Sequence, residues 1–290
     1  MKSRITTVFI LVATLFVSNG YSQEDDSQEK SNIQTYTPSK LLDKGQWDIK
    51  WFNNLYTETK FADSNGNSQD KLRENYFTST VEVFTGVSDN NRINIGAIVE
   101  FRSNTIGGRQ ALSVFSLEDT NTDRKGISSI APAVKWQPLE NVGNFSVQSA
   151  IHIPLEKNET ENGVFLDQTS WIFQNRFFYD YTLPNGKWQL FTELNTEYSF
   201  GEETSFANNT FLLVPSVFMS YFPSDKSTVL GFVQHSQRFG DFTQDYTALG
   251  FGGKYQITKV LNLEVLYSKF VRGTNNGLGQ SFNLGLRALF

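Results

Sequence analysis

The chain of 290 residues has no cysteine and only two histidines. It therefore offers no disulfide framework, no thiolate metal site and no thiol nucleophile. Long apolar runs are also scarce, and the mean hydropathy is -0.36. A transmembrane helix needs about 20 consecutive apolar residues, and a single run, residues 5–17, approaches that length. These absences exclude thiol chemistry and a bundle of membrane-spanning helices.

Positive charge is not concentrated anywhere in the sequence. The chain carries 25 lysines and arginines against 30 aspartates and glutamates, which gives a formal net charge of -5 at pH 7. Nucleic-acid binding needs a dense basic surface that displaces counterions from the phosphates. The scattered basic residues argue against a nucleic-acid partner.

The first residues are expected to direct export. Lys2 and Arg4 precede the apolar run, and small and polar residues follow it as far as Ser22. This order is typical of a secretory signal peptide, which we place at residues 1–22. The alternative is an N-terminal anchor helix, for which the run is short. Residues 23–44 are polar and acidic, so they are predicted to form a flexible periplasmic leader.

Residues 45–290 show repeated period-two alternation. In the first segment, Trp47, Ile49 and Trp51 alternate with Asp48 and Lys50. About twelve such segments follow one another, separated by asparagine, aspartate, glycine, serine and proline. Their length matches the roughly 9–11 residues with which a tilted β-strand crosses the hydrocarbon of a membrane.

The connections between segments alternate in length. Short turns follow the even-numbered segments, at residues 88–91, 140–143, 184–187, 223–226 and 258–259. Long polar loops follow the odd-numbered segments, at residues 60–71, 104–126, 156–163, 201–209, 240–244 and 273–279. This sorting is typical of outer-membrane barrels. The sequence thus predicts an all-β fold, a transmembrane antiparallel up-and-down β-barrel of about 12 strands. We expect the longest loop, 104–126, to form a constriction or lid.

Two stretches carry a resemblance to known proteins. The chain ends in alternating apolar residues and a terminal Phe290, which resembles the C-terminal strand of Gram-negative outer-membrane barrels; this implies that the barrel-assembly machinery recognises it. Segments 130–136, 149–155 and 249–255 resemble the family of outer-membrane barrels described as transporter-like or as phenol-degradation pathway proteins. That resemblance implies an outer-membrane location and a transport role, with an unspecified solute.

The predicted lumen is charged but nearly neutral overall. If the large apolar residues face lipid, the alternate positions face inward. One hypothesis is that opposite charges close into an ion-pair network that fills the barrel. The other is that acidic and basic ladders lie on opposed walls and orient a passing solute. The pore-lining candidates are Lys50, Glu82, Arg92, Glu100, Arg102, Lys135, His152, Arg176, Asp180, Glu193, Glu197, Lys254, Glu264, Arg272 and Arg287.

Aromatic residues are also expected inside, beside glycines that leave room for them. An apolar or aromatic solute could slide along such a track, although the same residues could simply pack a closed interior. The inward aromatic candidates are Phe52, Tyr56, Phe84, Phe178 and Phe191, and the glycines are Gly96, Gly250, Gly252 and Gly285.

Catalytic and metal sites are not predicted. An outer-membrane phospholipase places its serine and histidine two residues apart on one strand face, whereas His235 and Ser236 are adjacent and point to opposite faces. Loop residues from Asp63 to Glu74 echo the spacing of a calcium loop, but Ser68 occupies the position of the turn glycine. A solvated loop is the better interpretation, and we predict no catalytic residue, metal or cofactor.

We therefore expect a non-enzymatic channel that passively admits a small solute. Its location would be the outer membrane, with both termini in the periplasm, and its partners would be membrane lipid, lipopolysaccharide and the barrel-assembly machinery. The alternatives are a closed barrel with a structural or adhesive role and a lipid-modifying enzyme.

Overall fold

The computed structural model describes residues 38–118, 120–201 and 205–290. These all belong to one compact unit, Ser31–Phe290. The predicted signal peptide and the first part of the predicted leader, to residue 37, lie outside the described residues. Within the described ranges, no helix is long and apolar enough to cross a membrane.

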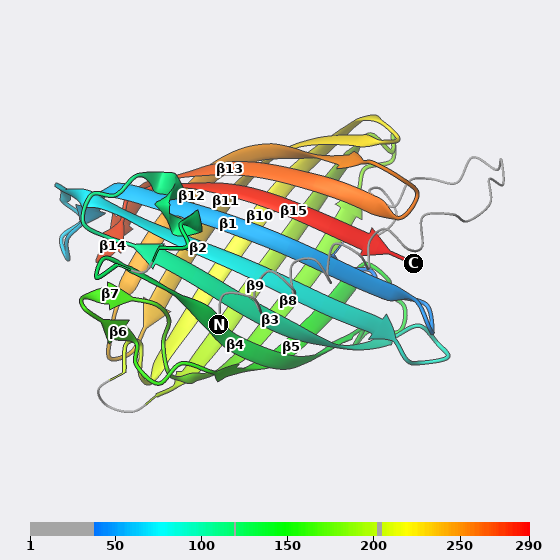
Figure 1. Cartoon of the computed structure of the whole chain (residues 1–290). Coiled ribbons are helices and arrows are strands. Elements are labelled where there is room, and N and C mark those ends of the chain that lie inside the picture. The colour runs from blue at the N-terminus through cyan, green and yellow to red at the C-terminus, as the bar shows by residue number, and fades with distance from the viewer. Residues whose placement is uncertain (1–37, 119, 202–204) are drawn as a thin grey trace. The chain divides into compact units, whose positions relative to one another are not determined.

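The described residues form one closed antiparallel barrel (Figure 1). Every long strand is hydrogen-bonded to its neighbour in the chain, and β1 also pairs with β15, which closes the ring. The predicted barrel of about 12 strands is confirmed. Its strands are β1 (Trp47–Ala62), β2 (Ser68–Gly86), β3 (Ile93–Thr105), β4 (Asp123–Trp136), β5 (Phe145–Pro154), β8 (Trp171–Thr182), β9 (Trp188–Phe200), β10 (Thr210–Ser224), β11 (Ser227–Phe239), β12 (Gln244–Gln256), β13 (Leu261–Thr274) and β15 (Gln280–Leu289).

Short elements accompany the barrel. The two-residue strand β14 (Asn276–Gly277) extends the sheet beside β1, and β6 (Thr160–Glu161) pairs with β7 (Val164–Phe165) inside one loop. A single 3-10 helix, η1 (Ala111–Phe115), is assigned in the part of the chain that the structure describes. We call the end of the barrel that carries the long connections the loop end, and the opposite end the turn end.

The first hairpin corrects one predicted loop. Residues 60–71 were expected to be a loop, but β1 and β2 remain paired as far as Ala62 and Ser68, so the turn spans only residues 63–67. The Asp63 carboxylate closes this turn by accepting the backbone N–H groups of Asn65 and Asn67, each at 2.9 Å. The hydrogen bond from the Asn67 N–H makes the largest contribution to lowering the pKa of Asp63. The role of this carboxylate is thus to close the turn.

The outer wall of the barrel is apolar. Large side chains that point outward from the strands are exposed, including Ile95 at 50%, Val229 at 58% and Phe251 at 63%. Their neighbours in sequence point inward, because successive side chains of a strand alternate between its two faces. A sheet that exposes this many apolar side chains outward is suited to a hydrocarbon environment.

The chain immediately before β1 folds into the turn end of the barrel. This leader segment, residues 38–44, belongs to the region expected to be a flexible leader, yet Ser39 is fully buried and Leu42 is 2% exposed. Leu42 packs against the inward-facing Phe84 and against Leu289, and its N–H donates to Asn94 Oδ1 at 3.2 Å. The burial of the Leu42 side chain holds the leader segment at the turn end, although most residues of the predicted leader are polar.

Two long loops at the loop end take opposite sides of the wall. The inner loop, residues 155–170, turns into the lumen, where the inward-facing Asn104 donates to the carbonyls of Phe165 and Leu166 at 2.7 and 3.1 Å. The outer-wall loop, residues 106–122, lies on the outside, where the outward-facing Ser103 donates to Val114 O at 2.7 Å. The expected constriction by the longest loop is therefore wrong, since residues 155–170 occupy the lumen instead.

Candidate functional site: the barrel lumen

The inward-facing side chains leave two cavities along the lumen. The loop-end cavity has a volume of about 650 Å³, and the turn-end cavity has a volume of about 450 Å³. Phe52, Phe218 and Leu266 line both cavities, so they mark the place where the two meet. The lumen is therefore neither a wide open pore nor an interior completely filled by side chains.

Ion pairs connect the wall of the turn-end cavity. Arg287 on β15 donates two hydrogen bonds to the Asp48 carboxylate on β1, at 2.7 and 2.8 Å. Lys50 Nζ lies 3.8 Å from Asp48 Oδ2 and 3.3 Å from Glu82 Oε2 on β2. Each of these four charges thus has a partner of opposite sign, which offsets the cost of removing it from bulk water.

The same series of ion pairs crosses the lumen to β8 and β9. Arg176 on β8 places Nη1 3.3 Å from Glu82 Oε1, and its Nε donates to Glu193 Oε1 on β9 at 2.7 Å. Strands β3, β4 and β5 separate β2 from β8 in the sheet. The Glu82–Arg176 contact therefore spans the lumen, and acids alternate with bases along the series. This arrangement matches the ion-pair network and not the opposed ladders.

Further ion pairs line the rest of the lumen, among them Lys71 with Glu58, at 2.8 Å in the loop-end cavity. Lys254 Nζ lies 2.7 Å from Glu264 Oε2 on the neighbouring strand. Arg102 Nε donates to Glu100 Oε1 at 2.6 Å, and its Nη1 lies 3.1 Å from Asp167 Oδ1 of the inner loop. Sequence patterns did not single out Asp167, because it lies outside the alternating segments and reaches the lumen only through the fold of the loop.

The structure distributes the sequence-predicted site residues over several places. Arg102 lines the loop-end cavity. Asp180 is buried, and Glu197 accepts hydrogen bonds from two amide side chains, but neither lines a cavity given above. Arg92 lies in a turn and donates to Gln137 O, and Arg272 is two-thirds exposed at the loop end. The turn-end cavity brings together Lys50, Glu82, Glu100, Lys135, His152, Arg176, Glu193, Lys254, Glu264 and Arg287.

An aromatic stripe crosses four neighbouring strands. The rings of Phe178, Phe191, Phe218 and Phe232 belong to β8, β9, β10 and β11 in turn, and successive centroids are 6.2, 5.5 and 5.0 Å apart. The sequence analysis named the first two and missed the last two. Phe218 shares the inward face with the buried Ser216 and Ser220, so the alternation of small residues was the signal that could have found it. The stripe lies beside the ion-paired Arg176 and Glu193 of the same strands, and Arg176 stands over the Phe178 ring, 5.1 Å from its centroid.

Glycines hold aromatic rings flat against the wall. A Cβ atom at Gly250 would lie 2.2 Å from Phe232 Cζ, and one at Gly96 would lie 2.5 Å from Phe84 Cδ1. Phe52 approaches Gly285 in the same way, at 3.2 Å. A side chain at Gly96 or Gly250 would displace the ring or the neighbouring backbone, so these glycines leave the rings room against the wall.

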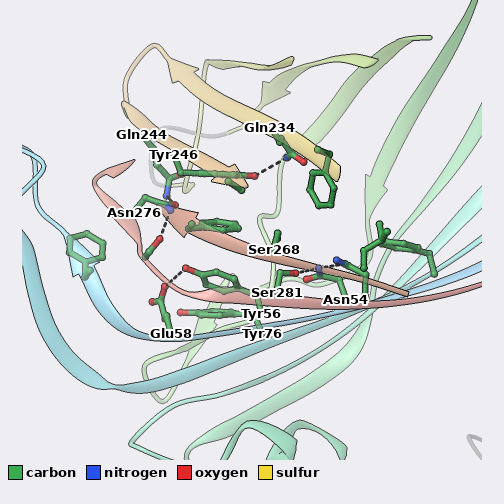
Figure 2. A pocket seen from close by; sticks show the side chains of 18 of the residues that line it. Asn54, Tyr56, Glu58, Tyr76, Gln234, Gln244, Tyr246, Ser268, Asn276 and Ser281 are labelled. Carbon is green, nitrogen blue, oxygen red and sulfur yellow. Dashed lines mark hydrogen bonds between the residues drawn. The ribbon is translucent and has the colours of Figure 1, made fainter. Parts of the chain in front are cut away.

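The loop-end cavity is lined by aromatic rings, by amide and hydroxyl side chains, and by the charged Glu58, Lys71 and Arg102. Figure 2 shows part of this lining. Tyr246 and Phe270 are stacked with centroids 4.2 Å apart, and Phe270 lies 4.8 Å from Tyr56. Gln234 Nε2 donates to Tyr246 Oη at 3.2 Å, and Tyr56 Oη donates to Glu58 at 2.7 Å. Such a surface can contact the flat face of a ring and hydrogen-bond a substituent at its edge.

The two histidines lie apart. His235 faces outward with its Nδ1 3.0 Å from Thr247 Oγ1, whereas Ser236 is buried on the inward face. His152 faces the lumen with its Nε2 3.5 Å from Gln174 Oε1. Within the described part of the chain, no three histidine or acidic side chains are arranged to hold a metal ion.

A closed barrel with an apolar outer wall and a charged, partly aromatic lumen defines a transmembrane β-barrel of the outer membrane. The family described as "Putative MetA-pathway of phenol degradation" has a model that matches residues 60–288. The chain belongs to this family.

Solved structures share the fold. The COG4313 outer membrane channel from Pseudomonas putida F1 is similar with a TM-score of 0.68 and 11% identity, over 92% of this chain and 100% of that chain. The β domain of the Bordetella autotransporter BrkA is similar with a TM-score of 0.57 and 12% identity, over 84% of this chain and 99% of that chain. No curated protein sequence matches the chain.

Proposed function

We propose that the protein is a passive outer-membrane channel for small apolar or aromatic solutes. The observation that carries this proposal is the position of Phe218, which belongs to the aromatic stripe and lines both cavities. A solute that leaves the loop-end cavity can therefore stay in contact with apolar wall as far as the turn-end cavity. The family description, with its reference to phenol degradation, supports this class of solute.

The state of the lumen charges supports the same choice. Lys50, Glu82 and Arg176 are held by one another and by their neighbours. To pass, a hydrated ion would have to break these ion pairs and lose part of its own hydration shell. Both steps cost free energy. An apolar solute needs only the ring surface of the aromatic stripe. The channel is thus proposed to conduct ions weakly and to favour uncharged solutes.

The proposed orientation places the turn end in the periplasm. The described N-terminal residues and Phe290 both lie at the turn end, where Trp47 and Phe290 exchange backbone hydrogen bonds of 2.7 and 3.0 Å. Short turns face the periplasm in barrels of this class, and long loops face outward. With this orientation, the barrel-assembly machinery would recognise the C-terminal strand β15 from the periplasm. The long loops would lie among lipopolysaccharide.

The test is current block in a planar bilayer by a neutral aromatic solute. Benzyl alcohol is added to the refolded chain, residues 23–290, and arabinose serves as a polar solute of comparable size. We expect benzyl alcohol to interrupt the current and arabinose to have a much weaker effect. The variant Phe218→Ser should lose the block, whereas Phe173→Ser, on the outer wall at 41% exposure, should keep it.

Three outcomes would contradict the proposal. Equal block in the wild type and in Phe218→Ser would remove the aromatic stripe from the path. A stronger block by arabinose would favour a polar solute. The absence of current under all conditions, in protein shown to be folded, would favour the alternative of a closed structural or adhesive barrel.

A further inference from the structure

The outer-wall loop, residues 106–122, exposes large apolar side chains at the loop end of the barrel. Leu112 is 68% exposed, Phe115 is 55% exposed and Leu117 is 81% exposed. Leu72, against which Gly108 lies, is 71% exposed. Single exposed apolar residues are common on proteins, but a group on one loop marks a surface with a partner.

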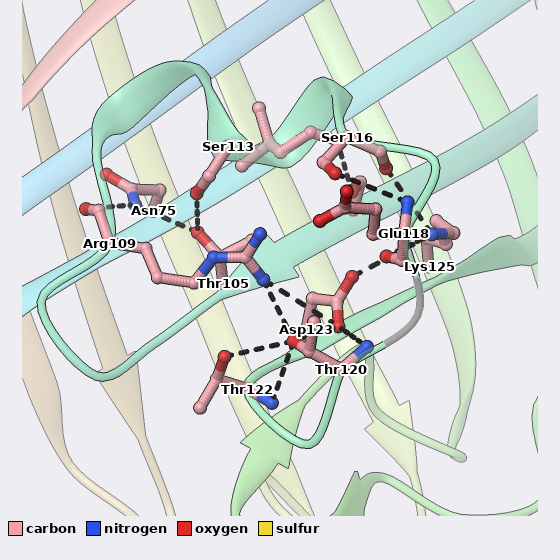
Figure 3. Close-up of polar contacts among 12 residues, drawn as sticks. Asn75, Thr105, Arg109, Ser113, Ser116, Glu118, Thr120, Thr122, Asp123 and Lys125 are labelled. Carbon is pink, nitrogen blue, oxygen red and sulfur yellow. Dashed lines mark hydrogen bonds and ion pairs between the residues drawn. The ribbon is translucent and has the colours of Figure 1, made fainter.

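The opposite side of this loop is tied to polar groups of the barrel wall (Figure 3). Asn75 Nδ2 donates to the carbonyls of Arg109 and Gln110 at 3.2 and 3.3 Å. Thr105 Oγ1 and Ser113 Oγ are 2.9 Å apart. Asn75 and Thr105 point outward from β2 and β3, and each is at most 1% exposed. The loop thus satisfies polar groups that would otherwise meet the surroundings of the barrel directly.

The base of the loop is fixed by charged side chains (Figure 3). Arg109 Nη1 donates to Thr120 Oγ1 at 3.0 Å and lies 3.8 Å from Asp123 Oδ1. Lys125 Nζ donates to the carbonyls of Ser116 and Glu118 at 3.4 and 3.2 Å. Polar contacts therefore converge on the wall side of the loop, and Leu112, Phe115 and Leu117 remain on its outer surface.

The exposed surface is continuous with the apolar outer wall. Phe115 packs edge-on against Phe77, an outward-facing residue of β2, with ring centroids 4.8 Å apart. Further outward residues on β4, which β3 separates from β2, are also exposed, such as Ile127 at 53% and Ile130 at 40%. This wall faces acyl chains in a transmembrane barrel. The loop extends the apolar wall toward the loop end and presents the same chemistry to its surroundings.

We propose that residues 109–117 insert among the lipid acyl chains of the leaflet at the loop end. The loop is a membrane-embedded cover: its apolar surface faces lipid, and its polar surface keeps Asn75, Ser103 and Thr105 away from lipid. A backbone or side-chain polar group left unsatisfied in hydrocarbon costs several kcal/mol, and the cover removes that cost. This inference does not depend on the solute or on which end faces the periplasm.

The absence of cysteine allows a direct test by spin labelling. Leu117→Cys and, in a second variant, Leu112→Cys are labelled with a nitroxide and reconstituted into vesicles of phosphatidylethanolamine and phosphatidylglycerol. Val265→Cys, on the outer wall of β13 at 52% exposure, is the lipid-facing reference. Asn121→Cys, an exposed residue of the same loop, is the water-facing reference.

Collision rates with oxygen, which concentrates in hydrocarbon, and with a water-soluble nickel chelate decide the result. We expect both leucine positions to resemble Val265→Cys, with oxygen collisions dominant, while Asn121→Cys shows the reverse. Nickel-dominated relaxation at both leucine positions would overturn the proposal. Dipolar broadening that disappears on dilution with unlabelled protein would also overturn it, because it would show that a second copy of the chain covers the surface. Current block by benzyl alcohol is measured separately, so failure of one proposal leaves the other intact.

Discussion

Glu82 on β2 and Arg176 on β8 meet across the lumen, with Oε1 and Nη1 3.3 Å apart, although three strands separate β2 from β8. The pairs Arg287–Asp48 and Lys254–Glu264, by contrast, each join neighbouring strands. The Glu82–Arg176 pair bridges the lumen beside the aromatic stripe, since Arg176 also lies over the Phe178 ring, 5.1 Å from its centroid. We expect this side-chain contact to narrow the path through the turn-end cavity, which Glu82 and Arg176 both line.

Removal of the Glu82 charge is predicted to widen this path. Glu82→Gln weakens the bridges to both Lys50 and Arg176. If one bridge contributes about 1 kcal/mol, its loss raises the population of the separated state about fivefold. Single-channel recordings should show higher conductance and a shift toward anions. Glu264→Gln is the control, because Glu264 pairs with Lys254 along the wall, and an equal effect in both variants would refute the assignment.

The effect of glycine on the width of the lumen can be tested at one position. In Gly250→Ala, the new Cβ would meet Phe232 Cζ at 2.2 Å, so the ring must shift into the lumen. We expect a loss of stability of about 1–3 kcal/mol and a lower conductance. Gly231→Ala is a matched control, since its Cβ would meet nothing closer than 3.8 Å. Urea unfolding in detergent measures the first effect, and similar midpoints for the two variants would argue against it.

The sequence predicted the barrel because each strand is locally encoded. Alternation such as Trp47, Ile49 and Trp51 follows from a wall with lipid on one side. The loop of the first hairpin was predicted too long, because the Asp63 carboxylate closes a tight turn by accepting two backbone N–H groups. The polar residues on either side of that turn led to the prediction of a loop, although they continue the two strands beyond the apolar wall.

The arrangement of the lumen was only partly predictable. Inward positions such as Lys50 and Arg176 follow from alternation, but their partners depend on which strands face each other across the barrel. The inner loop and the leader segment enter the lumen through contacts at Asn104 and Leu42. Such contacts join residues far apart in the chain, so no local pattern records them.

The leader segment is predicted to depend on Lys135. Its Nζ donates to the carbonyls of Pro38 and Lys40, and a hydrogen bond from a charged donor is worth about 1.5–3 kcal/mol. Lys135→Met should therefore release the segment at least about tenfold more often. Ser39→Cys, buried in the native state, reports release through its rate of reaction with a maleimide. Lys254→Met serves as the control, and equal rates in the two backgrounds would contradict the prediction.

The inner loop should respond to its own contact with the wall. Asp167 Oδ1 lies 3.1 Å from Arg102 Nη1, and this pair fixes residues 155–170 inside the loop end. Asp167→Asn keeps the size of the side chain and removes its charge. If the charge contributes about 1.4 kcal/mol, opening of the loop becomes about tenfold more frequent. A cysteine at Leu166, which is 1% exposed, should then react with a maleimide about tenfold faster in Asp167→Asn, but not in the control Asp241→Asn on another loop. An unchanged rate would mean that the other contacts of the inner loop, such as those of Asn104 and Arg124, hold it without the Arg102–Asp167 pair.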